Sequence, residues 1–469
     1  MAYSTISKHT THFNTTLYSG TGSNATVTGV GFQPDFFWIK QRTSNQGHLL
    51  WDAIRGGNYY VPSSSTAQSN ADIGTFTVAS DGYSYGSDAA YNGSGHTYVG
   101  YNWKAGGTAP TKTYHVVVVS DSGNKYRFRN TADSATFGSS AVTLDLQEGG
   151  TYTFDVSDST LNSHPFVIGT AANGTEYSTG VTYKLDGVTK TYSQYTSGFS
   201  AATSRQLVIT LAASAPALYY WCSAHSGMGG AINTNSTFGS SNFDGNKQSK
   251  VTANQTSGFS MVEYSGSGSS STIGHGLSSA PKMIMVKRMS SSDSWTVYHT
   301  ASGAGKFLRL DTTGAESSNT NTWANTAPTS TVFSVNHDDT NASGQTFQAY
   351  CFADVDGYQK MGLYKGNEST DNAFVYTGFK PSFVLIKNIH GTNNWMLFDN
   401  KREGYNPDND ALHPNINDAE QTDDEIDLLS NGFKIRLSNQ ETGHNGHRYA
   451  YFAIGQTMVG SNNVPATAR

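Results

Sequence analysis

The sequence predicts an all-β protein built from tandem antiparallel β-sandwiches, and three observations support this fold class. Charged residues make up only 14% of the 469 residues, whereas aromatic residues make up 12%. Short apolar and aromatic runs alternate with turns rich in Gly, Ser and Asn, and the chain contains 49 glycines. Runs of about five or six residues have the length of strands. Segments of the chain also recur in a fixed order, which indicates repeated domains.

One recurring segment pairs a proline with a lysine six residues later. Its three copies read VGFQPDFFWIKQR, LSSAPKMIMVKR and TGFKPSFVLIKN, with the pairs Pro34–Lys40, Pro281–Lys287 and Pro381–Lys387. Proline removes one donor from a strand ladder, so each proline is expected at the start of a strand. A lysine at a strand end is usually solvated or pairs weakly with a neighbouring aspartate. We therefore expect these lysines to lie on the surface.

Two further segments follow the proline in every copy at nearly constant distances. HLLWD, WTVYH and WMLFD end 18 residues after the proline, at Asp52, His299 and Asp399. Each copy then closes with GHTYVGYNW, GQTFQAYCF or GHRYAYFAI. Three segments in one order and with one spacing predict three related β-sandwich domains.

A stretch that lacks these segments separates the first copy from the second. It begins after WKAGGTAPTKT and ends before NTNSTFGSSNFDGN, which read as linkers. We therefore expect four domains: repeat copies at residues 1–109, 239–356 and 357–469, and an inserted β-sandwich at 110–238. Sandwiches on short linkers favour a rod in which contacts join mainly neighbouring domains.

The inserted domain carries four residues typical of a metal site. His164 lies in SHPF, and Cys222, His225 and Met228 lie in YYWCSAHSGMGG, between two predicted strands. With this order and spacing the domain resembles the cupredoxins, the small β-sandwiches of blue-copper proteins. The resemblance implies that these four residues bind copper, which a thiolate, two imidazoles and a long axial thioether suit. The alternative is a cupredoxin scaffold without metal, in which the cysteine is only a small buried apolar residue.

Several functional classes are disfavoured by composition. The net charge is −6 and no cluster of Lys and Arg occurs, so we expect no nucleic-acid partner. No run of about 18 apolar residues occurs, so we expect no membrane insertion. Two cysteines form no disulfide framework, as expected of a chain that is made in a cytosol. Common nucleophile, phosphate-binding and zinc-protease motifs are missing, so we expect no enzyme. The acidic residues 418–427 are expected to form a solvated loop or short helix.

The opening of the chain carries a second resemblance. MAYSTISKHTTHFNTTLYSGTGSNATVTGVGFQPDFFWIKQR, followed by HLLWDAIRG and GHTYVGYNWKAGG, closely resembles virion proteins of marine tailed bacteriophages. In that group, GFQPDFxWIK domains occur in several copies and resemble concanavalin-like jelly-roll sandwiches. Copy two matches more loosely, because it lacks the Gly-Phe before its proline.

This second resemblance implies a structural virion protein made in the host cytoplasm. It implies a tail fibre or appendage that mediates host-surface attachment. The partners it suggests are other virion subunits, further copies of the chain in a trimer, and a host-surface glycan. Three alternatives stay open: a capsid decoration or head fibre protein, an array of carbohydrate-binding modules, and a copper-binding redox protein.

Overall fold

The computed structural model describes residues 6, 8–57, 59–67, 70–71, 76–403, 405–406 and 408–456. The chain forms two compact units. Unit 1 comprises residues 1–105, 253–271 and 277–469, and unit 2 comprises residues 106–252 and 272–276. The three repeat copies contribute to unit 1, and the inserted stretch lies in unit 2. The all-β prediction is confirmed, whereas the four predicted domain boundaries stay a prediction.

The same four-stranded antiparallel sheet occurs three times in unit 1, which confirms the repeated architecture. Its strand order is β1-β9-β3-β4 in copy 1, β22-β29-β24-β25 in copy 2 and β30-β37-β32-β33 in copy 3. The strands are β1 (Phe13–Ser19), β9 (Thr97–Trp103), β3 (Phe36–Gln41), β4 (Leu49–Asp52), β22 (Phe259–Ser265), β29 (Thr346–Ala353), β24 (Pro281–Arg288), β25 (Thr296–His299), β30 (Gln359–Lys365), β37 (Arg448–Gly455), β32 (Pro381–Asn388) and β33 (Trp395–Asp399). Prolines begin β24 and β32, as predicted, while β3 begins two residues after Pro34.

Shorter strands extend or cover these sheets. In copy 3, a second sheet of order β31-β36-β35-β34 packs on the first through a buried apolar layer that includes Val384, Phe398 and Phe433. The remaining elements of unit 1 are η1 (His9–Thr11), β2 (Ala25–Val27), β5 (Tyr59–Pro62), β6 (Asn70–Ala71), β7 (Thr77–Ala79), β8 (Gly82–Tyr85), α1 (Ala89–Asn92), β26 (Lys306–Arg309), β27 (Ser317–Ser318), β28 (Val332–Val335), α3 (Asp338–Asn341), β31 (Phe374–Tyr376), β34 (Asp408–Ala411), β35 (Gln421–Leu429) and β36 (Gly432–Ile435). Two sheets with apolar residues between them are a sandwich.

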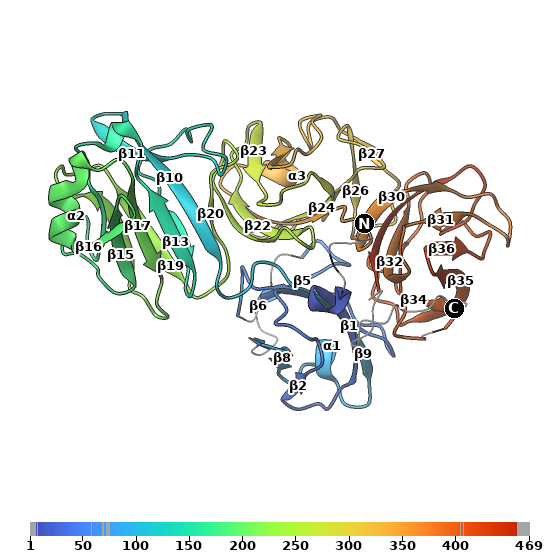
Figure 1. Cartoon of the computed structure of the whole chain (residues 1–469). Coiled ribbons are helices and arrows are strands. Elements are labelled where there is room, and N and C mark those ends of the chain that lie inside the picture. Colours follow the sequence, from blue (N-terminus) through green and yellow to red (C-terminus); the bar gives the residue numbers. More distant parts are fainter. Residues whose placement is uncertain are drawn as a thin grey trace. The chain divides into compact units, whose positions relative to one another are not determined.

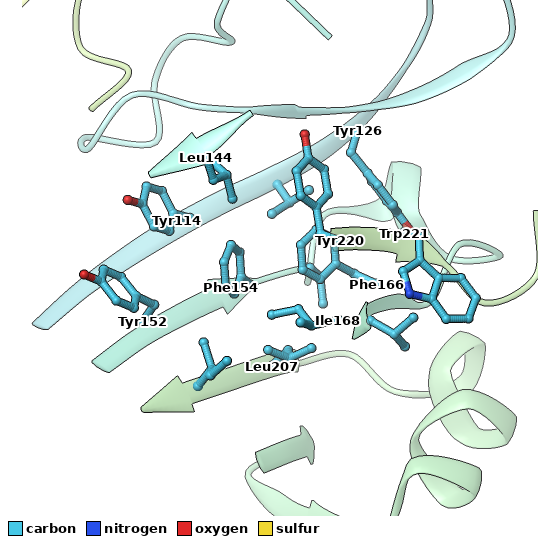
Figure 2. Close-up of a cluster of buried hydrophobic side chains, with 14 of the residues drawn as sticks. Tyr114, Tyr126, Leu144, Tyr152, Phe154, Phe166, Ile168, Leu207, Tyr220 and Trp221 are labelled. Carbon is cyan, nitrogen blue, oxygen red and sulfur yellow. The ribbon is translucent and has the colours of Figure 1, made fainter. Parts of the chain in front are cut away.

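Unit 2 is a second kind of sandwich, with sheets of order β11-β10-β13-β17-β15-β16 and β12-β19-β18-β14 (Figure 1). Its elements are β10 (Thr111–Ser120), β11 (Asn124–Phe128), β12 (Leu144–Gln147), β13 (Thr151–Asp155), η2 (Ser159–Leu161), β14 (Phe166–Gly169), β15 (Val181–Leu185), β16 (Val188–Lys190), α2 (Tyr192–Gly198), η3 (Phe199–Ala201), β17 (Arg205–Thr210), β18 (Leu218–Cys222) and β19 (Gly230–Asn235). Further strands follow at β20 (Ser240–Asn242), β21 (Ser249–Asn254) and β23 (Ser271–Gly274). Phe154, Phe166 and Tyr220 stack in the apolar layer between the sheets (Figure 2).

The expectation that the repeated lysines are solvated is wrong. Lys40, Lys287 and Lys387 have no exposed surface. Each ammonium donates to a carbonyl six residues further along its own copy, at Gln46, Asp293 and Asn393 respectively. It also donates to a carbonyl of another copy: Lys40 to Asn417 at 3.2 Å, Lys287 to Thr66 at 3.0 Å and Lys387 to Thr313 at 2.8 Å. Burial of an ammonium is costly unless such oxygens surround it, which explains why the loops lie close to it.

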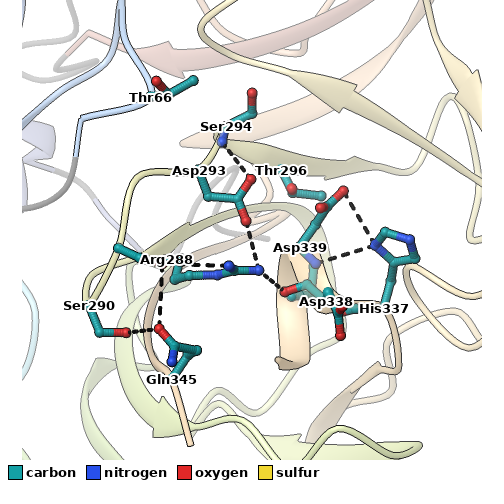
Figure 3. Close-up of polar contacts among 12 residues, drawn as sticks. Thr66, Arg288, Ser290, Asp293, Ser294, Thr296, His337, Asp338, Asp339 and Gln345 are labelled. Atoms are coloured by element: carbon teal, nitrogen blue, oxygen red, sulfur yellow. Dashed lines mark hydrogen bonds and ion pairs between the residues drawn. The ribbon is translucent and has the colours of Figure 1, made fainter. Parts of the chain in front are cut away.

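These bonds close a cycle of three junctions. Copy 1 donates to copy 3, copy 2 to copy 1, and copy 3 to copy 2, so the predicted rod of sequential neighbours is wrong for unit 1. At the copy 2–copy 1 junction the Asp293 amide also donates to the Thr66 carbonyl at 2.9 Å. Arg288 and Ser294 hold the Asp293 carboxylate (Figure 3).

A second donor, carried on an aromatic or imidazole ring, repeats at each junction, at the residue that precedes β4 or β25 or that begins β33. The His48 ring lies 3.1 Å from the His413 carbonyl, and the indoles of Trp295 and Trp395 donate at 2.8 Å to the carbonyls of Pro62 and Arg309. Aromatic rings also meet across the junctions, with centroids 4.6 Å apart for Phe36–Tyr350, 5.8 Å for Trp103–Phe383 and 4.8 Å for Phe352–Phe452.

A buried tyrosine–aspartate pair spans two of the three junctions. The Tyr350 hydroxyl donates to Asp52 Oδ2 and the Tyr101 hydroxyl donates to Asp399 Oδ2, both at 2.7 Å. Each aspartate also pairs with an arginine three residues later, Arg55 or Arg402. At the third junction both partners differ. His299 replaces the aspartate, and its ring nitrogen lies 3.1 Å from the Tyr451 carbonyl, while Phe452 replaces the tyrosine.

The acidic stretch 418–427 is not the predicted loop or helix, because most of it lies in β35. Glu420, just before that strand, bridges Arg42 of copy 1 at 2.7 Å and Arg402 of copy 3 at 2.8 Å. The carboxylate is therefore part of the copy 1–copy 3 junction. Among the described residues, no helix has the length and apolar character needed to cross a bilayer.

Tyr350→Phe is expected to lower the free energy of unfolding by about 1.5–3 kcal/mol, because it removes a buried hydrogen bond to the charged Asp52. Tyr101→Phe should act similarly through Asp399. Tyr376→Phe, at a position 63% exposed, is the control and should change stability by less than about 0.5 kcal/mol. Urea unfolding followed by tryptophan fluorescence measures all three; equal stability of the junction variants and the control would contradict the role given to these pairs.

Stability is expected to rise with pH between about pH 7 and pH 10. Burial lowers the pKa of Lys40 and Lys287 to about 8 and that of Lys387 to about 7. In the unfolded chain each lysine regains a pKa of about 10.4. The folded state therefore binds fewer protons in this window, so its stability increases with pH and is lost as pH falls through the folded values. Denaturant titrations across the window should show a smaller increase for Lys287→Met; an unchanged slope would refute this assignment.

Candidate metal centre

The loop that carries three of the predicted ligands joins two paired strands. β18 ends at Cys222 and β19 begins at Gly230, and the strands pair antiparallel with Tyr219 opposite Ala231. The predicted hairpin is thus confirmed. Gly229 is required where the loop closes, because a Cβ there would lie only 1.7 Å from the Tyr220 carbonyl oxygen.

Strand pairing brings the fourth predicted ligand to this loop. β14 runs antiparallel to β18 with Phe166 opposite Cys222, so His164 reaches the same end of the sheet. The backbone is tied at this point, since the Ser223 amide donates to the Pro165 carbonyl at 3.1 Å. The Tyr126 hydroxyl donates to the His164 carbonyl at 2.9 Å. Three strands, β11, β14 and β18, therefore fix where the His164 ring stands.

Three donor atoms converge at this end of unit 2. The Cys222 sulfur lies 3.9 Å from His164 Nδ1 and 3.7 Å from His225 Nδ1, and the two Nδ1 atoms are 3.0 Å apart. Among the described residues, this is the group of His, Cys, Asp and Glu side chains whose ligand atoms come close enough together to hold a metal ion. The structure thus brings together three of the four predicted ligands, His164, Cys222 and His225.

The spacing of these atoms fits a trigonal metal site. Metal–nitrogen bonds of about 2.0 Å and a metal–sulfur bond of about 2.3 Å, at trigonal angles, put nitrogen and sulfur about 3.7 Å apart and the nitrogens about 3.5 Å apart. Both nitrogen–sulfur distances match this expectation. The nitrogens lie closer, at 3.0 Å, where one ring nitrogen can share its proton with the other in a hydrogen bond. A metal ion would take the place of that proton.

One side of this group of residues is buried and the other is exposed to solvent. Cys222 and His164 are buried, whereas His225 is exposed. Burial and then the neighbouring His225 lower the pKa of His164, which keeps its imidazole neutral and able to bind metal. Asn124 Nδ2 lies 3.3 Å from His164 Nε2. With a metal at Nδ1 the proton sits on Nε2, so Asn124 would present its carbonyl oxygen instead.

Met228 is a buried residue of the loop itself. Its side chain is 1% exposed and belongs to the apolar core that also contains Cys222 and Trp221. Its carbonyl accepts from the Tyr126 amide at 2.9 Å, which ties the loop to β11. The methionine is therefore buried in the same apolar cluster as Cys222.

The chain matches, over residues 8–215 and 233–457, the family described as "Domain of unknown function (DUF7483)". It belongs to this family. The match leaves out residues 216–232, which carry Cys222, His225 and Met228, so membership of DUF7483 makes no statement about this loop. No curated protein and no solved structure matches the chain.

Several residues around this centre and in unit 1 were not predicted from the sequence. Asn124 and Tyr126 contact His164 from β11, and no sequence signal singles them out because their role depends on which strands lie side by side. The repeated lysines did carry a signal, their constant position, but strand-end lysines in general are solvated. Only the three-copy cycle shows that they are buried.

Proposed function

We propose that unit 2 of this DUF7483 protein binds a soft transition-metal ion, copper, through His164, Cys222 and His225, with Met228 as a weak axial ligand. The observation that carries the proposal is the convergence of the Cys222 sulfur and two Nδ1 atoms within 3.9 Å of one another. A trigonal set of two imidazoles and a thiolate beside a thioether suits copper better than hard cations.

The chain's own residues would hold the ion and restrict access to it. Cys222, Met228 and His164 are buried, while His225 leaves one ligand edge at the surface. Bound copper supplies one-electron redox chemistry in general. The role that we assign to the ion is structural, because an ion that binds the folded loop but not the unfolded chain stabilises the fold.

Copper addition tests this proposal. The wild-type chain is expected to bind one equivalent, to show strong visible sulfur-to-copper absorption with Cu(II), and to unfold at a higher temperature. Cys222→Ser should lose all three effects, whereas Cys351→Ala, which removes the buried thiol of unit 1, should keep them. Met228→Leu preserves apolar packing and should change the spectrum while retaining bound metal.

Metal analysis by mass spectrometry must accompany the spectra, since Cu(I) and Zn(II) are colourless. The proposal fails if the purified chain binds no copper or zinc, or if Cys222→Ser binds as much metal as the wild type. Zinc binding without copper binding would keep the ligand set and overturn the choice of metal.

We further propose that the whole chain is a non-enzymatic structural protein on the exterior of a tailed-phage particle, as a fibre or appendage. The resemblance of residues 1–109 to phage virion proteins supports this role. The closed cycle of junctions in unit 1 supports it too, since three sandwiches joined by buried polar bonds make a stiff building element. Host-surface attachment, and capsid decoration as its alternative, differ in where the chain lies in the particle.

Mass spectrometry of purified particles, with antibody labelling by electron microscopy, tests this second proposal. We expect stoichiometric amounts of the chain in intact particles and label at the tail or its appendages. Label over the head would replace attachment with decoration. Particles that contain none of the chain would refute a virion role altogether, whatever unit 2 binds.

A further inference from the structure

Unit 1 contains a cavity of about 270 Å³ at the junction of copy 1 with copy 3. It lies between the starts of β1 and β32 and the ends of β33 and β37. The residues that line it include His9, Phe13, Thr15, Asn400, Lys401 and Gln456. We call it the copy 1–copy 3 cavity. Its volume is near the lower end of the range for small-molecule sites, about 300 Å³, so it suits a ligand of one small ring.

Buried polar atoms without partners line this cavity. Thr15 Oγ1 and Asn400 Oδ1 are buried, and neither has a hydrogen-bond partner. The amide of Asn400 is oriented, because its Nδ2 donates to Gln456 Oε1 at 3.0 Å, which leaves Oδ1 as an acceptor. Buried polar atoms are nearly always paired in native proteins, so these two call for a polar group inside the cavity.

His9 adds a third such group. Its ring is 1% exposed, and neither nitrogen has a partner in hydrogen-bonding geometry, although the backbone of Gly455 and Ile6 lies near. Burial lowers the pKa of His9, so the imidazole is neutral and offers one donor and one acceptor.

Comparison with copy 1 shows that a junction of this kind does not require the polar residues Asn400 and Lys401. Asn400 and Lys401 follow Asp399, and the equivalent residues after Asp52 in copy 1 are Ala53 and Ile54. Ala53 and Ile54 are 2% and 1% exposed, so apolar side chains are buried at those positions. Copy 1 thus packs its junction with apolar residues at these two positions, whereas copy 3 has polar residues there.

The lining defines the chemistry of the occupant. Thr15, Asn400 and His9 are neutral and together offer both donors and acceptors, Lys401 is the one cation, and no carboxylate lines the cavity. Phe13 supplies an apolar wall. A ligand whose groups both donate and accept, on a small ring with an apolar face, meets all of these conditions. Sugar hydroxyls have this property.

We propose that the copy 1–copy 3 cavity binds one hexose-type sugar residue, free or as the end of a glycan, through Thr15, Asn400 and His9. The inference does not depend on the metal centre in unit 2. It extends the proposed attachment role by naming a class of ligand. Sugar binding by the cavity can be tested without that role, and only its use in host attachment rests on the proposed function.

Saturation-transfer NMR and calorimetry on the full chain test the proposal, with the methyl glycosides of glucose, galactose, mannose and N-acetylglucosamine as probes. We expect saturable binding of at least one glycoside. The double variant Asn400→Ala, Lys401→Ile installs the residues of copy 1 and should weaken binding at least about tenfold, as expected from loss of one good hydrogen bond. Asn321→Ala, on an exposed loop of copy 2, is the control and should bind like the wild type.

Thr15→Val, which keeps side-chain shape and removes the hydroxyl, provides a second variant if the double variant does not fold. It too should weaken binding, and unchanged thermal unfolding will show that the chain is intact. Absence of saturable binding by any probe means a cavity filled by water only and overturns the proposal. Equal affinity in the wild type and both cavity variants overturns it as well, whereas the particle location of the chain is unaffected by either result.

Discussion

The architecture of unit 1 depends on one constraint: a buried ammonium group must be surrounded by oxygen atoms. Each copy buries a lysine near the end of β3, β24 or β32, and the loop that follows supplies one carbonyl. Another copy supplies the next carbonyl. Removing a charge from water is costly, and the two carbonyls offset part of that cost only when the copies are in contact. The lysine therefore links the fold of one sandwich to the presence of its neighbour.

The three junctions share this lysine and a neighbouring ring donor, but they differ elsewhere. Two junctions carry a tyrosine–aspartate pair, and the third replaces both partners together, with Phe452 and His299. A buried carboxylate without its hydroxyl would be poorly satisfied, as would a tyrosine hydroxyl facing no acceptor, so the two positions change as a pair. At the copy 1–copy 3 junction Glu420 bridges two arginines. The cavity with unpartnered polar atoms lies at the same junction.

In unit 2, contacts between distant segments also form the candidate metal centre. Two side chains 58 residues apart meet because Phe166 pairs with Cys222, and this register fixes His164 beside the loop. The loop itself is short and begins and ends in paired strands, which restricts where its three predicted ligands can lie. The same register places the two Nδ1 atoms 3.0 Å apart, close enough for a hydrogen bond between the rings.

The sequence by itself determined the fold class, the three repeat copies, the hairpin around Cys222 and the four candidate ligands. These are local features: strand patterns, constant spacings and residue types that keep their meaning whatever surrounds them. Only the tertiary structure decided that Lys40, Lys287 and Lys387 are buried, that copy 1 meets copy 3, and that Asn124 faces His164. The reason is that burial and hydrogen-bond partners depend on contacts between segments 40 to 377 residues apart in the sequence. A lysine at a strand end has the same sequence pattern whether water or a carbonyl of a neighbouring copy accepts its hydrogen bonds.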